Sequence, residues 1–93
     1  MPNVNRYMNG KDKTVLQSVL LNKNRFKTKQ DCIYYLKTHK YYYDGIDTEP
    51  HWQYWRCRQY MPDDTNYYYR VLLVNKNVKS VPAYLKHGSV SHK

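Results

Sequence analysis

A ten-residue stretch with a two-residue alternation is the feature that most limits how this chain folds. Residues 51–60 read HWQYWRCRQY. Because successive side chains of a β-strand point to opposite faces of the sheet, this period predicts a strand. Trp55 and Cys57 give one face an apolar centre, so we expect both in the core. The opposite face carries Trp52, Tyr54, Arg56, Arg58 and Tyr60.

The remaining patterned segments predict one helix and three further strands. Apolar and β-branched residues at 14–21 predict a strand well inside a sheet. Apolar residues three and four positions apart predict a helix over 29–39, which begins after a Thr28 N-cap in an approximate capping box. Strands are also predicted over 67–74, after a hairpin-type connection, and over 78–85.

These elements predict an α+β fold of two layers. One helix is expected to pack on a four-stranded, mainly antiparallel sheet, in the chain order β-α-β-β-β. The helix is expected to cover the face with Trp55 and Cys57, which leaves the Arg56/Arg58 face more open. Pro82 has no N–H to donate to a neighbouring strand, so the last strand is predicted at the sheet edge.

Length and composition predict a single domain with a small core. The chain has 93 residues, and its 41% hydrophobic share includes 12 tyrosines, whose hydroxyls need polar partners. We expect a domain over 13–86, a flexible N-terminal arm over 1–12 and a tail over 87–93. Cys32 and Cys57 form no CxxC pair, which favours buried thiols in a reducing compartment over a disulfide scaffold or zinc site.

The charge of the chain favours a polyanionic partner. Lys and Arg number 16 against 7 acidic residues, and the net charge is +9. Such an excess favours nucleic acid, and less often an acidic protein or anionic lipid, although solubility alone also accounts for charge on a small domain. No apolar run reaches the length of a membrane span and no signal-peptide core is present, so we expect an intracellular protein without a membrane partner.

The arginines of the 51–60 stretch are the leading candidates for a nucleic-acid site. The planar guanidinium of Arg matches phosphate oxygens, and aromatic rings offer platforms for unstacked bases. Arg70 is expected to join this face, because hairpin neighbours place their side chains side by side. The alternative is structural, since acids just upstream could pair with both arginines. These acids are Asp44, Asp47 and Glu49.

A basic loop before the predicted helix is the second candidate. Its cations lie near a helix N-terminus, where backbone N–H groups also favour anions, so the loop is a candidate phosphate contact. The alternative is a solvated loop with no ligand. The four residues are Lys23, Arg25, Lys27 and Lys29.

Catalytic patterns are weak in this sequence. The histidines form no HxH or HExxH pair, and the acidic residues lie in loops rather than in pairs on one strand face. We therefore expect no enzymatic activity, no metal and no cofactor. The histidines are His39, His51, His87 and His92.

Four segments form a pattern that covers about residues 14–85. They are Ser18–Leu21, then Thr28 with Cys32, Tyr35, Leu36 and His39, then Asp47–Glu49, and most specifically Tyr54–Gln59. They resemble a small uncharacterised domain of tailed phages and large DNA viruses, whose pattern runs V-L-F, A-x-x-W-L-x-x-H-G, D-E-T, Y-x-R-F-R-Q and G-I-K-A-V. This chain departs from it at Cys32, Tyr35, Lys40, Cys57 and residues 78–81. The resemblance implies a viral or phage origin and transfers no active site.

These observations lead us to expect a viral binding module that contacts DNA or RNA phosphates through the arginine face and the basic loop. It would act in the host cytoplasm or nucleus, or in the virion. The alternative is a minor virion component, or a module that binds a viral or host protein of acidic character. Tyrosine triplets at 41–43 and 67–69 would then form the interface. The sequence leaves open whether the chain forms a homo-oligomer.

Overall fold

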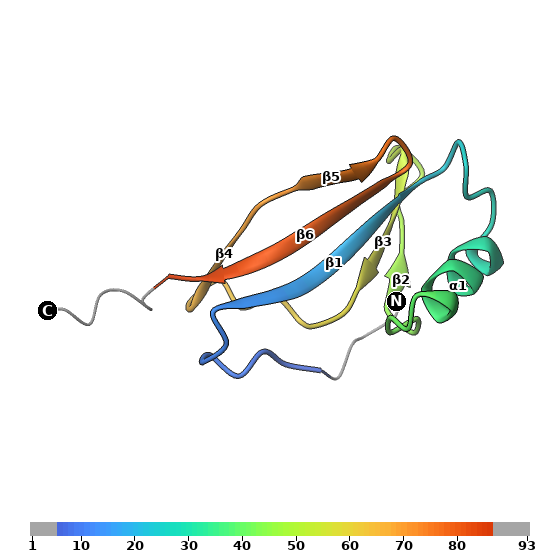
Figure 1. The fold of residues 1–93 in the computed structure, drawn as a ribbon. Helices are drawn as coiled ribbons and strands as arrows, with labels where there is room; N and C mark the ends of the chain where they lie inside the picture. Colours follow the sequence, from blue (N-terminus) through green and yellow to red (C-terminus); the bar gives the residue numbers. More distant parts are fainter. Residues whose placement is uncertain (1–5, 87–93) are drawn as a thin grey trace, which may run out of the picture.

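Strand β1 (Thr14–Asn22) lies at the centre of the sheet in the computed structural model of the chain (Figure 1). It pairs antiparallel with β3 (Tyr54–Arg58) on one side and with β6 (Val78–Leu85) on the other. β2 (Ile46–Asp47) extends the sheet beyond β3, while β4 (Tyr67–Tyr69) and β5 (Leu72–Asn75) both pair with the far side of β6. The structure describes residues 6–86. Within them the α+β class and the antiparallel pairing are confirmed, but the sheet has six strands rather than the predicted four.

One of the extra strands comes from the segment predicted as an acidic loop. Ile46 pairs with Cys57, and Asp47 pairs with Arg56, so this segment forms the short strand β2. Ile46 is 2% exposed and belongs to the core. Burial of the Ile46 side chain in the core therefore stabilises this segment as a strand of the sheet.

The other extra strand arises because Pro82 interrupts a ladder. The N–H of Arg70 donates to the carbonyl of Pro82 at 3.2 Å, but Pro82 has no N–H to donate in return. The strand predicted over 67–74 is therefore divided into β4 and β5 at this point. The prediction that the last strand lies at the sheet edge is wrong, since β6 has paired strands on both sides.

The connection at residues 61–66 is not a hairpin turn. β3 and β4, which flank it, are separated by β1 and β6 in the sheet order β2-β3-β1-β6-β4. The chain therefore crosses from one side of the sheet to the other between these two strands. This crossing decides which of the predicted site residues meet.

Helix α1 (Lys29–Thr38) begins at the predicted cap. Thr28 Oγ1 accepts a hydrogen bond from the N–H of Asp31 at 3.2 Å, and the Asp31 carboxylate accepts one from the N–H of Thr28 at 3.2 Å. His39 is the C-cap, and Lys40 follows with a φ of 63°. This is the left-handed conformation that glycine usually supplies after a helix.

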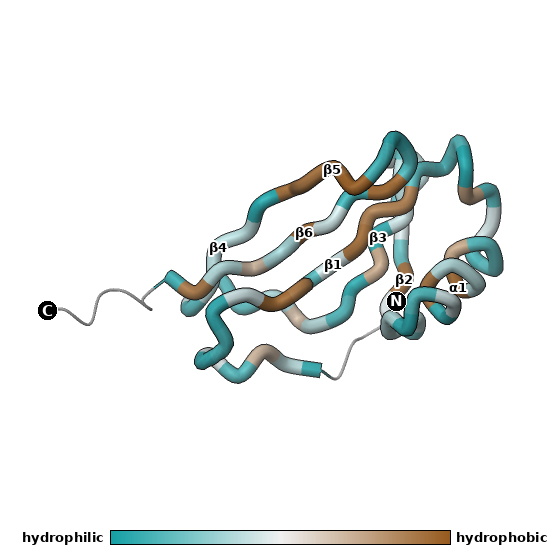
Figure 2. The backbone as a smooth tube through the Cα atoms, viewed as in Figure 1, coloured by the Kyte–Doolittle hydropathy of each residue, from teal (hydrophilic) through white to brown (hydrophobic). Residues whose placement is uncertain are grey.

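The helix covers the predicted face of the sheet. Cys32, Leu36 and Cys57 are fully buried together in one core cluster. Trp55 is half-buried against this cluster and donates its Nε1–H to the carbonyl of Phe26 at 3.0 Å. Figure 2 shows hydrophobic segments along β1 and on α1. Within residues 6–86, no helix is long and apolar enough to cross a membrane.

Candidate nucleic-acid interface

The sheet face opposite α1, called here the open face, carries side chains from β3, β1 and β6 in two rows. Residues opposite one another on paired strands define each row. The first row contains Arg56, Leu20 and Lys79, and the second contains Arg58, Ser18 and Val81. Lys79 therefore lies on the same face as both β3 arginines, two strands and roughly 10 Å across the sheet from Arg56.

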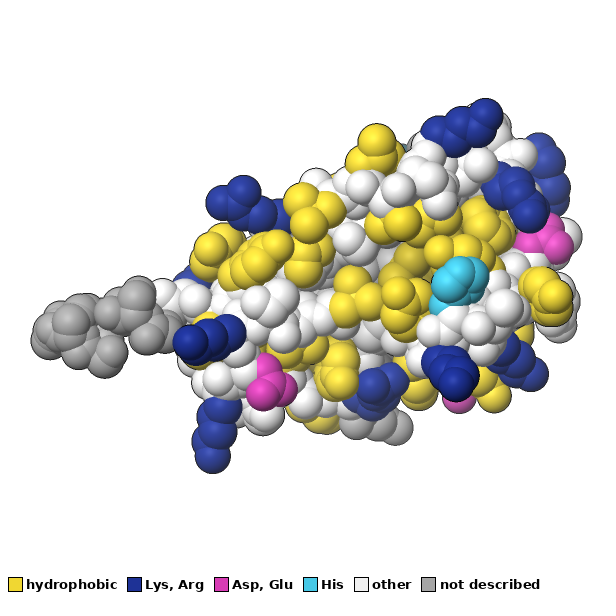
Figure 3. Space-filling view, viewed as in Figure 1, with side chains coloured by type: hydrophobic (Ala, Val, Ile, Leu, Met, Phe, Trp, Pro, Cys, Tyr) yellow, Lys and Arg dark blue, Asp and Glu magenta, His cyan; other side chains and the backbone are white. Residues whose placement is uncertain are grey.

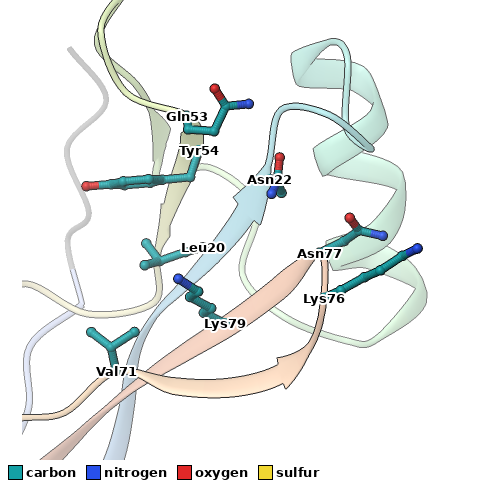
Figure 4. Close-up of a pocket in the computed structure, with 8 residues that line it drawn as sticks. All are labelled: Leu20, Asn22, Gln53, Tyr54, Val71, Lys76, Asn77 and Lys79. Carbon is teal, nitrogen blue, oxygen red and sulfur yellow. The ribbon is translucent and has the colours of Figure 1, made fainter.

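A groove runs across the open face. It consists of two adjoining hollows of about 170 and 310 Å³, which share Leu20 and Tyr54 in their linings. Figure 4 shows the first hollow, with Tyr54, Leu20, Lys79 and Val71 pointing to the same side of the sheet, away from α1. Arg56 and Arg58 line the second hollow. The groove thus combines an apolar floor with cations on both sides.

Asp47 neutralises one of the two β3 arginines. Arg56 donates from Nε to Asp47 Oδ1 at 3.1 Å and from Nη2 to Asp47 Oδ2 at 2.9 Å. The hydrogen bonds to this carboxylate raise the pKa of Arg56 above its ordinary value, against a smaller opposing effect of burial. The structural alternative therefore holds for Arg56: β2 supplies its counter-ion.

Arg56 also supports the aromatic side chains on its side of the groove. Its guanidinium carbon lies 4.9 Å from the centroid of the Trp52 ring. Trp52 in turn stacks on Tyr54, with ring centroids 5.1 Å apart and an interplanar angle of 14°. Stacks of this kind hold large rings in one orientation. Tyr54 is therefore presented to the groove on a fixed support.

Arg58 has no carboxylate partner among the described residues, where the Arg56–Asp47 pair is the one ion pair within 4 Å. Asp44 and Glu49, the other two acids of the predicted loop, are exposed and make no such contact there. Arg58 is half-buried and lines the groove. Within the two rows of the open face, Arg58 and Lys79 are thus the cations whose charge is not compensated within the described chain.

Two predicted site residues lie elsewhere. Arg70 lies opposite Pro82 of β6, so its side chain points to the α1 side of the sheet. There its guanidinium carbon lies 6.0 Å from the centroid of the Tyr84 ring. The expectation that it joins Arg56 and Arg58 is wrong, because β4 and β5 are not neighbours of β3.

Tyr60 lies beyond the end of β3 and does not line the groove. The guanidinium of Arg6 sits between the rings of Tyr42 and Tyr60, 4.8 and 4.5 Å from their centroids, and donates to the Tyr60 hydroxyl at 3.1 Å. The N–H of Met61 donates to the Arg6 carbonyl at 2.8 Å. The described part of the predicted arm, residues 6–12, is therefore attached to the domain here. Residues 1–5 and the predicted tail at 87–93 lie outside the described residues.

The basic loop adjoins one end of the groove. It follows Asn22, which lines the first hollow, and Gln53 of the groove wall donates to Asn24 of the loop at 3.2 Å. Lys23 is partly engaged, since its Nζ donates to the Glu49 carbonyl at 3.1 Å and lies 5.7 Å from the Trp55 ring. The exposed cations of the loop are Arg25, Lys27 and Lys29.

Lys79 and Lys76 were not among the predicted site residues, although both line the groove. Alternation along the predicted strand 78–85 places Lys79 and Val78 on opposite faces of the sheet. If this strand had been predicted to pair with 14–21, Lys79 would have been assigned to the same face as the arginines. Figure 3 shows that Lys and Arg side chains also stand at several separate places on the face in view. The positive charge of the chain is therefore not confined to the groove.

The described histidines and cysteines do not line the groove. No group of three His, Cys, Asp or Glu residues within 6–86 is placed to hold a metal ion. His39 stacks on Tyr35 at 4.0 Å, and the exposed His51 lies edge-on to Trp52 at 6.2 Å, while His87 and His92 lie outside the described residues. The neighbouring Cys32 thiol, together with burial, raises the pKa of the Cys57 thiol above its ordinary value. Both effects favour the neutral thiol over the nucleophilic thiolate.

Comparison of the chain with protein-family models, with curated proteins and with solved structures finds no match.

Proposed function

We propose that this chain is a small basic module that binds nucleic acid in the open-face groove. The observation that carries the proposal is the juxtaposition of Arg58 and Lys79, whose charges are uncompensated within the described chain, with the supported Tyr54 ring. Arg and Lys provide donors to phosphate oxygens, and Tyr provides a ring face for a base. The net charge of +9 adds attraction over a longer range.

A single-stranded segment suits the groove better than a duplex. Stacking on Tyr54 requires a base that is free of its neighbours, which a single strand supplies at little cost. Leu20 and Val81 give the groove an apolar centre, beside polar side chains that include Asn22, Gln53 and Ser18. Binding is expected to depend strongly on phosphate charge, because Arg58 and Lys79 would contact the phosphates rather than the bases.

The test uses fluorescence anisotropy with a labelled oligothymidine at several salt concentrations. Arg58→Ala with Lys79→Ala is expected to weaken binding roughly tenfold. The slope of log affinity against log salt concentration is expected to become shallower by about 0.7 for each phosphate that the variant no longer neutralises. Arg70→Ala with Lys37→Ala is the matched control, because it also removes one Arg and one Lys, from exposed positions on the α1 side of the sheet. Binding that does not depend on salt, or that weakens equally in both variants, would overturn the proposal.

A second function has its own supporting observation on the α1 side of the sheet. Tyr68 is 44% exposed and stacks on Tyr84 with centroids 5.5 Å apart, next to Arg70. Exposed aromatic pairs beside an Arg are typical of protein interfaces. An acidic viral or host protein is the partner this surface fits. A stable complex that survives nuclease treatment and is lost in Tyr68→Ala would support this second function over the first.

A viral or phage origin rests on the resemblance of residues 14–85 alone. Within the proposal it accounts for a small binding module that acts beside a genome, in the infected cell or in the virion. Detection of the protein in purified particles, or only in infected cells, separates these two sites of action.

A further inference from the structure

Strand β5 and the residue before it expose four consecutive aliphatic side chains. The exposed fractions are 59% for Val71, 45% for Leu72, 69% for Leu73 and 59% for Val74. Leu73 lies opposite Lys79 and therefore on the open face with Val71, whereas Leu72 lies opposite Ser80 on the other face. Within the described residues, neither face of this segment is covered. Figures 1 and 2 show β5 as a hydrophobic strand at the outer side of the sheet, beyond β6. Runs of this kind on a surface mark an interface.

Among residues 6–86, no strand pairs with the outer edge of this segment's backbone. Arg70 donates to Pro82, and the same register continues to Leu72 opposite Ser80, so the polar backbone groups of 70 and 72 point towards β6. Those of Val71 and Leu73 consequently point away from the sheet. Proline and inward-pointing lysine commonly protect such edges, and residues 71–73 contain neither.

We propose that a second copy of this chain covers the edge, with the two β5 strands paired antiparallel about a two-fold axis at Leu72. In this register each Leu72 faces Leu72 of the other copy as a non-hydrogen-bonded pair. Val71 of each copy exchanges both backbone hydrogen bonds with Leu73 of the other. Val71, Leu72 and Leu73 of each copy then face aliphatic side chains of the other copy across the interface.

The register shift between Leu73 and Asn75 selects this register, because it ends the regular edge just beyond Leu73. An axis at Leu72 pairs Val71 of each copy with Leu73 of the other, and both residues lie within the regular edge. An axis at Leu73 would instead place Val71 opposite Asn75, beyond the shift. Arg70 is the one charged residue in 70–74, and with the axis at Leu72 it does not lie opposite a like charge.

Pairing of this kind joins the two sheets into one, with both open faces on the same side. The grooves of the two copies would then lie on one continuous basic surface. The dimer does not depend on the proposed function, because its contacts are aliphatic and backbone contacts. A short strand pair buries less than a standard interface of about 1,600 Å², so micromolar affinity is expected.

Sedimentation velocity of the protein without nucleic acid, over a range of micromolar concentrations, tests the dimer. Because each copy carries +9, added salt is expected to strengthen dimerisation, whereas it weakens binding to nucleic acid. Leu73→Lys is expected to abolish the dimer. Tyr34→Lys, at a 75% exposed position on α1, is the matched control and is expected to leave it unchanged. A monomer at all concentrations and salts, or a dimer that persists in Leu73→Lys, would overturn the inference.

Cross-linking tests the register independently. Under mild oxidation, Leu72→Cys is expected to form a disulfide between copies, because a non-hydrogen-bonded antiparallel pair brings the two Cα atoms to about 4.5 Å. Leu73→Cys, one residue away and more exposed, is expected to cross-link far less because it faces Val71 rather than itself. The natural cysteines, Cys32 and Cys57, are fully buried and do not compete. Equal cross-linking of the two variants would contradict the register.

Discussion

Asp47 holds Arg56 through two hydrogen bonds of 3.1 and 2.9 Å, so that β2 supplies the counter-ion for the strand beside it. Asp47→Asn removes this charge. The variant is expected to lose about 1 kcal/mol of stability, because the pair is partly exposed. Its affinity for oligothymidine is expected to rise roughly threefold, since Arg56 becomes available to phosphate.

Asp44→Asn is the matched control for this prediction. It makes the same change in charge at an exposed position that has no ion pair among the described residues. Urea unfolding and anisotropy titration of the two variants separate a local release of Arg56 from a general effect of net charge. Equal gains in affinity would show that Arg56 does not contribute.

The faces of β3 could be predicted because they depend on local alternation alone. Cys57 and Trp55 lie on the α1 side and Arg56 and Arg58 on the open side, as a two-residue period requires. The capping box at Thr28 was equally local. Such features are decided by residues within a few positions of each other, and the sequence displays them directly.

The partners of β3 could not be predicted because they depend on the order of strands in the sheet. The sequence places 51–60 and 67–74 next to each other along the chain, which favours a hairpin and brings Arg70 to Arg56. In the structure β1 and β6 lie between β3 and β4. Lys79 of β6 therefore shares the open face with Arg56, and Arg70 points to the α1 side. Burial of β1 between two strands, a long-range effect, decides this arrangement.

Lys40 is expected to store strain that a glycine would relieve. Its φ of 63° is left-handed, a conformation that costs a residue with a Cβ about 1 kcal/mol. Lys40→Gly is therefore expected to stabilise the fold by up to about 1 kcal/mol, measured by urea unfolding. Lys37→Gly, inside α1, removes the same charge and is expected to destabilise by about 1 kcal/mol. A loss of stability in Lys40→Gly would contradict this account of the C-cap.

The buried thiols are expected to make stability fall at alkaline pH. Because Cys32 and burial raise the pKa of Cys57, the folded state keeps this thiol neutral where the unfolded state ionises it. The stability that the neutral Cys57 thiol contributes is fully present below about pH 8.5, the ordinary thiol pKa. It is lost as pH rises above that value.

Urea unfolding at a series of pH values between neutral and alkaline checks this prediction. Cys57→Val removes the titrating group and is expected to flatten the dependence. In the native protein both thiols are fully buried, so a thiol reagent at neutral pH is expected to react only as fast as the chain opens. Rapid reaction of either thiol in native conditions would contradict the burial of the pair.

Pro82 separates β4 from β5, so restoring an N–H at this position is expected to join them. In Pro82→Ala the new N–H can donate to the carbonyl of Arg70, whose own N–H already donates to residue 82 at 3.2 Å. The added hydrogen bond contributes about 1 kcal/mol, and the greater freedom of the unfolded chain offsets a similar amount. The free energy of unfolding is therefore expected to change little. Amide hydrogen exchange, however, should show strong protection at residue 82, and an unprotected amide there would mean that another constraint divides the strand.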